Sequence, residues 1–224
     1  MFVTLVTDFV IMMNDRPDLS FWHTPDLDEE YTVETNVSTI EDYIPLEHHL
    51  FRDQDYEVCA KIDPSEKGLI NRFNKGSLSD PEQWDQNWNR SFEMPVNRPR
   101  AAVLLLHGMS DSPYSLRNLG EALHASGVYV VGLRIPGHGT APSGLVRVTW
   151  QDMEAAVTIA MKHVAEKADG GPVHIVGYSN GGALAVNYAL EAANDPSLPQ
   201  VNSLALISPE IGVTGAAAFA VWQA

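Results

Sequence analysis

The stretch PVHIVGYSNGGALAVNYAL, residues 172–190, places one serine, Ser179, between two glycines. An apolar run precedes this serine, and a run rich in alanine and leucine follows it. A short apolar run that ends in glycine is typical of a buried strand, whereas the longer Ala/Leu run favours a helix. Ser179 is therefore predicted to lie on a tight turn from strand to helix.

Three further apolar runs resemble the one before Ser179, and they suit strands buried on both faces of a parallel sheet. They are AAVLLLHG (101–108), VYVVGLRI (128–135) and SLALIS (203–208). Helix-like segments alternate with these runs, one with Ser112 as N-cap and Pro113 in its first turn, another with Thr149 as N-cap. The alternation predicts an α/β fold with a doubly wound, mostly parallel sheet and right-handed crossovers.

The first part of the chain has a different texture, being acidic, polar and dotted with aromatic residues. We predict an ordered N-terminal extension over residues 1–97 and a partial α/β core over residues 98–224. Within the extension, short helices are expected around 40–58 and 64–75, and a short strand in FEMPV (92–96). The apolar start MFVTLVTDFVIMM (1–13) is shorter than the roughly 20 residues that span a bilayer. It is either a buried element or the remnant of a membrane anchor, which leaves localisation open between soluble cytoplasmic and N-terminally anchored.

Composition excludes several classes of partner. The 14 basic against 29 acidic residues give a net charge of −15, which argues against binding to nucleic acid or an anionic membrane. Cys59 is the single cysteine, so the chain has no internal disulfide and no cysteine-rich metal site. No metal or organic cofactor is predicted, and the oligomeric state is left open.

The serine motif carries a specific chemistry. Gly177-Tyr178-Ser179-Asn180-Gly181 is a G-x-S-x-G sequence, whose glycines let strand and helix pack closely while the serine projects. An oxyanion hole needs two backbone N–H groups aimed at one point. One is expected from Asn180 and the other from Met109, in the His107-Gly108-Met109 loop that follows an earlier strand. Gly108 lets that loop approach a substrate.

Four ordered motifs carry a resemblance to a known superfamily: LLLHGMSDSPYSL (104–116), GLRIPGHGTAPSG (132–144), TWQDM (149–153) and GYSNGGALAV (177–186). The chain resembles the α/β-hydrolases, in the branch of carboxylesterases, monoacylglycerol lipases and serine-aminopeptidase-like hydrolases. The resemblance implies a serine hydrolase that acts on a small-molecule acyl substrate, a carboxylic ester, through an acyl-enzyme. It implies Ser179 as the nucleophile, Met109 and Asn180 as oxyanion donors, and a structural His138.

The sequence also departs from that family, in which an acid and then a histidine follow the serine. No histidine follows Ser179. We interpret His124 and His163 as surface residues and His174 as buried, while Glu210 occupies a place where some relatives hold the acid. We therefore expect a C-terminally truncated sequence, with AAAFAVWQA (216–224) as the opening of a helix or cap. The alternatives are a serine peptidase of aminopeptidase type and, if the chain ends at Ala224, a non-catalytic pseudo-hydrolase.

Overall fold

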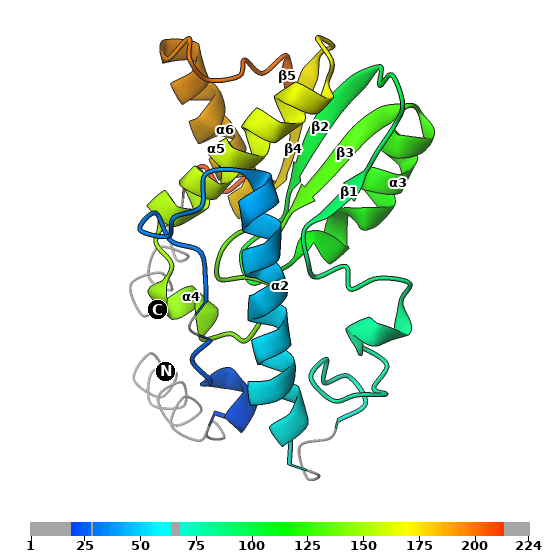
Figure 1. The fold of residues 1–224 in the computed structure, drawn as a ribbon, viewed down its shortest axis with the longest axis vertical. Helices are drawn as coiled ribbons and strands as arrows, with labels where there is room; N and C mark the ends of the chain where they lie inside the picture. Colours follow the sequence, from blue (N-terminus) through cyan, green and yellow to red (C-terminus); the bar gives the residue numbers. More distant parts are fainter. Residues whose placement is uncertain (1–18, 28, 64–67, 213–224) are drawn as a thin grey trace, which may run out of the picture.

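The computed structural model describes residues 19–27, 29–63 and 68–212, which build one five-stranded sheet in the order β1-β3-β2-β4-β5 (Figure 1). The strands are β1 (Phe92–Met94), β2 (Ala101–Leu106), β3 (Val128–Leu133), β4 (Val173–Tyr178) and β5 (Ser203–Ile207). β1 is antiparallel to β3, and all other neighbouring strands are parallel. The sheet confirms the predicted fold class, and β1 confirms the strand expected in FEMPV.

Helices cover both faces of this sheet. Successive side chains of a strand point to opposite faces, and β2 shows both environments: Leu104 packs in the cluster with α5 and α6, and Leu105 packs on the α3 side. The helices are α2 (Ile40–Glu57), α3 (Arg117–Ala125), α4 (Gly144–Arg147), α5 (Trp150–Lys167) and α6 (Asn180–Asn194). The 3-10 turns are η1 (Phe21–His23), η2 (Cys59–Lys61), η4 (Pro81–Gln83) and η5 (Pro113–Leu116).

The two predicted helix starts have different outcomes. Thr149 caps α5 in a reciprocal capping box, since its hydroxyl accepts from the Asp152 N–H and the Asp152 carboxylate accepts from the Thr149 N–H. Ser112 does not cap a helix with its side chain, because its hydroxyl donates to Asn89 Oδ1 at 2.7 Å. The chain after Ser112 first forms the 3-10 turn η5, and α3 begins only at Arg117.

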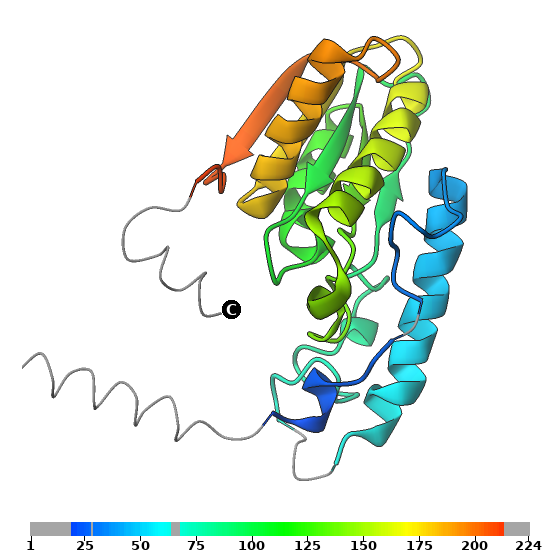
Figure 2. The ribbon, with the colours of Figure 1, turned by 90° about the vertical axis from the view of Figure 1, so that its left-hand side faces the viewer.

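The segment before β1 packs against the α/β core. Tyr31, Ile40 and Tyr43 are buried in the same cluster as the sheet residues and α5, and α2 lies on the side of the molecule away from β5 (Figure 2). This packing joins the described part of the N-terminal segment to the same core as the sheet, and the ordered extension over residues 1–97 stays a prediction. The division at residue 97 also stays a prediction. β1 precedes that boundary in the sequence, yet it pairs with β3 and so is part of the sheet.

Two expectations made from local pattern are corrected. Residues 68–75 form turns and bends in place of the predicted helix. β5 is exposed along most of its length, where burial on both faces was expected, because within the described chain it is an edge strand that pairs only with β4.

Two expectations concern the ends of the chain. The anchor remnant at 1–13 and the helix or cap at 216–224 both lie outside the described residues. Among the helices that the structure describes, none combines the length and the apolar character that crossing a bilayer requires.

The prediction that His163 is a surface residue is wrong. His163 is only 6% exposed on α5, and its two ring nitrogens lie 3.4 Å from the Glu41 carboxylate and 3.0 Å from the Glu93 carboxylate. Glu93 also accepts a hydrogen bond from the Tyr129 hydroxyl. The pairing with His163, assisted by the Tyr129 hydrogen bond, outweighs burial and lowers the pKa of Glu93.

We expect Glu93→Gln to lower the melting temperature near neutral pH by roughly 2–4 °C, for a loss of about 1 kcal/mol. A lowered folded-state pKa stabilises the fold above the unfolded pKa of about 4.3, and that contribution disappears as pH falls through the folded value. The difference between wild type and variant should therefore shrink as melting is followed from pH 7 towards pH 3. Glu41→Gln is the matched control, since Glu41 is 65% exposed and should matter less. A difference that does not change with pH would contradict the assignment.

Candidate active site

Ser179 occupies the turn between β4 and α6 in a strained backbone conformation. Its φ is 51° and its ψ is −117°, a combination that costs a non-glycine residue about 1–3 kcal/mol. Hydrogen bonds hold the turn in place: the Ser179 N–H donates to Ile207 O, and the Ser179 carbonyl accepts from the N–H groups of Gly182 and Glu210. The side chain makes no capping bond to α6. The hydroxyl therefore has no capping function within the fold.

The glycines around Ser179 are required by close backbone contacts. A Cβ on Gly177 would lie 2.4 Å from Gly181 O, and a Cβ on Gly181 would lie 2.2 Å from Leu106 O. Side chains at either place would push α6 away from β4 and β2. The glycine positions predicted for the motif thus have a steric reason in the structure.

The loop after β2 meets the Ser179 turn. A Cβ on Gly108 would lie 3.2 Å from Ser179 Cβ and 3.1 Å from the Tyr178 ring. Met109 follows directly and is 47% exposed. Asn180 is the first residue of α6, so its N–H belongs to the unpaired end of that helix, where negative charge is stabilised. The structure brings together the loop of Met109 and the turn of Ser179 and Asn180.

His107 holds the loop after β2 from beneath. The Ile135 N–H donates to His107 Nε2 at 3.1 Å, so the ring proton lies on Nδ1, which donates to Gly108 O at 2.8 Å. Burial, together with the nearby His138 ring, lowers the pKa of His107 to about 3, so the ring is neutral. In a trans peptide, C=O and N–H point in opposite directions. The bond to Gly108 O therefore turns the Met109 N–H away from His107.

The other histidines have partners away from Ser179. His138 is 2% exposed, stacks edge-on against His107, and bonds through Nδ1 to Pro136 O. His174 was expected to be buried but is only half-buried, with Nδ1 bonded to the Ser203 hydroxyl, because it faces the edge strand β5. His124 is half-exposed and contacts Pro95 O.

Among the described residues, no carboxylate and histidine lie together beside Ser179 as a catalytic acid and base. Glu210 is exposed, and its backbone N–H donates a hydrogen bond to Ser179 O at 3.0 Å. His48 and His49 are exposed on α2. Within residues 19–27, 29–63 and 68–212, no group of histidine, cysteine and carboxylate side chains is placed to hold a metal ion.

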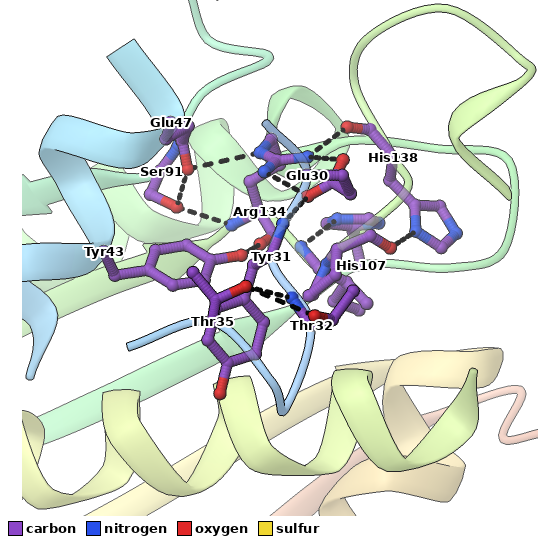
Figure 3. A network of polar contacts seen from close by, with 12 residues as sticks. Glu30, Tyr31, Thr32, Thr35, Tyr43, Glu47, Ser91, His107, Arg134 and His138 are labelled. Carbon is purple, nitrogen blue, oxygen red and sulfur yellow. Dashed lines mark hydrogen bonds and ion pairs between the residues drawn. The ribbon is translucent and has the colours of Figure 1, made fainter. Parts of the chain in front are cut away.

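Sequence reasoning missed one residue beside this site. Arg134 follows β3 and is 1% exposed, with carboxylates of Glu30 and Glu47 against its guanidinium (Figure 3). Its only signal in the sequence is a charged residue inside the otherwise apolar run VYVVGLRI.

The sheet order, the helices on both faces and the serine turn after a parallel strand define an α/β-hydrolase fold. The chain matches the family described as serine aminopeptidase, S33, over residues 97–223, and it belongs to that family. The family match confirms the resemblance seen in the sequence.

Individual relatives are lipolytic enzymes. The chain is 33% identical over 87 residues to a thermostable monoacylglycerol lipase of Bacillus sp. (strain H-257). This match covers 39% of this chain and 34% of that protein. A solved structure from work on the metagenome-derived lipolytic enzymes LipS and LipT is 29% identical, with a TM-score of 0.50, over 58% of this chain and 49% of that one. The monoacylglycerol lipase of Paleococcus ferrophilus is 21% identical, with a TM-score of 0.45, over 59% and 49%. The chain thus spans from a third to half the length of these relatives.

Proposed function

We propose that Ser179 is the nucleophile of a serine hydrolase that acts on carboxylic esters of small-molecule acyl substrates. One observation carries the proposal: a serine held at a φ of 51° between a parallel strand and a helix N-terminus, with the loop of Gly108 packed against it. Strained residues of this kind concentrate at functional sites, because the surrounding structure must be built to hold them.

The geometry supports an acyl-transfer sequence. Ser179 Oγ attacks the ester carbonyl and loses its proton to a general base, which is none of the described histidines. The carbonyl oxygen becomes an oxyanion, and the backbone N–H groups of Met109 and Asn180 donate to it. Collapse of this intermediate breaks the bond to the alcohol, which leaves with a proton, and water then releases the acid from Ser179.

A serine peptidase of aminopeptidase type is the second candidate, favoured by the description of the family. It would use the same nucleophile and oxyanion donors on an amide. Ester hydrolysis is placed first because the relatives at 33% and 29% identity are both lipolytic enzymes.

Covalent labelling tests the assignment of Ser179. The protein is treated with a fluorophosphonate, which reacts with activated serines, and the adduct is mapped by mass spectrometry. We expect the adduct on Ser179, its absence in Ser179→Ala, and its retention in Ser208→Ala, a serine that also has a positive φ. Protection by a short-chain p-nitrophenyl ester but not by an aminoacyl anilide would favour the esterase over the peptidase. An adduct on another residue, or none on Ser179, would refute the proposal.

A further inference from the structure

Arg134 is a buried cation held by the N-terminal segment of the chain (Figure 3). Its guanidinium donates to both oxygens of Glu30, at 3.0 and 2.9 Å, and its Nε lies 3.3 Å from Glu47 Oε2. Burial alone would lower the pKa of Arg134, but the carboxylate of Glu30 raises it above its ordinary value, so the side chain stays charged. A buried cation with two carboxylates and directed hydrogen bonds has one well-defined position.

The main chain of Arg134 is held by the same segment. Its N–H donates to the Ser91 hydroxyl at 2.8 Å, and its carbonyl accepts from the Tyr43 hydroxyl at 2.8 Å. Ser91 is itself fixed, because its N–H and hydroxyl both donate to the Glu47 carboxylate at 2.7 Å. Residues from three places before β2 thus fix both the backbone and the side chain of one residue at the end of β3.

Two routes lead from Arg134 towards Ser179. Along the backbone, the next residue, Ile135, donates its N–H to His107 Nε2, and His107 Nδ1 donates to Gly108 O. Through the side chain, Arg134 Nη1 donates to His138 O at 2.9 Å, and the His138 ring packs against His107 with ring centroids 5.1 Å apart. Both routes converge on His107, which orients the Gly108–Met109 peptide.

We propose that Arg134 is a positioning residue, through which the docked N-terminal segment sets the orientation of the Met109 N–H. The inference rests on the proposed function for its catalytic consequence, since only a serine hydrolase uses that N–H as an oxyanion donor. The segment around Glu30, Tyr43, Glu47 and Ser91 then acts on the site through Arg134 and His107.

The first test reads the His107 tautomer and needs no activity. In protein labelled with 15N-histidine, NMR should show His107 protonated on Nδ1 only. Arg134→Lys keeps the charge but loses the planar fork that binds Glu30 and His138 O together, and Glu47→Gln removes one carboxylate with little change of shape. Both variants should shift the His107 signals towards a mixture of tautomers. Asp26→Asn, which breaks the exposed pair of Asp26 with Arg147, should leave them unchanged. Unchanged signals in folded Arg134→Lys and Glu47→Gln would overturn the proposal.

The second test separates positioning from folding. Ester turnover is normalised to Ser179 sites titrated with fluorophosphonate, so that unfolded protein does not count. We expect kcat to fall about tenfold or more in Arg134→Lys and Glu47→Gln with KM changed little, because an oxyanion donor acts on the transition state. If the other variants fold poorly, Glu30→Gln should show the same fall in kcat with little change in KM. A lower number of titratable sites with normal kcat per site would show a merely structural role and refute the inference. Failure of Ser179 labelling in the wild type would instead refute the proposed function, and the tautomer test would still stand.

Discussion

Replacing Ser179 with alanine is expected to lower the turnover of a short-chain p-nitrophenyl ester by about 10⁴- to 10⁶-fold. The variant keeps the oxyanion donors of the proposed site, so a residual rate about 10³- to 10⁴-fold above that of water is the floor. A loss of this size is larger than any packing effect can explain, since the missing group is one oxygen. The measurement is kcat for the purified protein with and without the substitution.

Stability should hardly change in Ser179→Ala, and this separates chemistry from folding. The Ser179 hydroxyl makes no capping bond to α6, and alanine meets the same strain as serine at a φ of 51°. Ser208→Ala is the matched control, because Ser208 also has a positive φ, of 44°, but no proposed part in the reaction. The variant and the control should melt within about 1–2 °C of wild type. Equal turnover in wild type and Ser179→Ala would remove Ser179 from the mechanism.

The sheet and the position of the serine are predictable because their signals are local. Each buried strand is a continuous apolar run, and the neighbouring parallel strands β2 and β4 end at the same edge of the sheet. The loop of Gly108 and the turn of Ser179 must therefore meet. Only the exposure of β5 departs from this pattern, since a run of apolar letters does not say whether a strand lies inside or at the edge.

Long-range polar contacts are not predictable from the same signals. The helical pattern around His163 does not distinguish it from an exposed residue of the same helix. It is buried beside carboxylates from α2 and β1, which are distant in the sequence. Arg134 is similar, because Glu30, Glu47 and Ser91 are brought to it only by the docking of the N-terminal segment. A buried charge is stable only where such partners assemble. A charged residue within an apolar run therefore predicts that partners exist, but it does not identify them.

Met109 gives the second large effect, because its proposed contribution lies in the backbone and not in the side chain. Met109→Pro removes the N–H that the oxyanion requires, and kcat should fall by about 10²- to 10³-fold. Met109→Ala keeps that N–H, and the side chain it shortens is 47% exposed, so kcat should stay within a few-fold of wild type. The two variants lose the same side chain, and the difference between them isolates the donor.

Proline also restrains the backbone, so its effect on the loop has to be separated from the loss of the donor. A trifluoromethyl ketone forms a tetrahedral adduct with an active serine and reports on the oxyanion contact. Its affinity should fall in Met109→Pro by about the same factor as kcat, while KM for the ester changes little, because the donor is stronger in the transition state than in the ground state. If Met109→Ala and Met109→Pro lose activity equally, the side chain and not the N–H is what matters. The oxyanion hole would then have to be built from other donors beside Asn180.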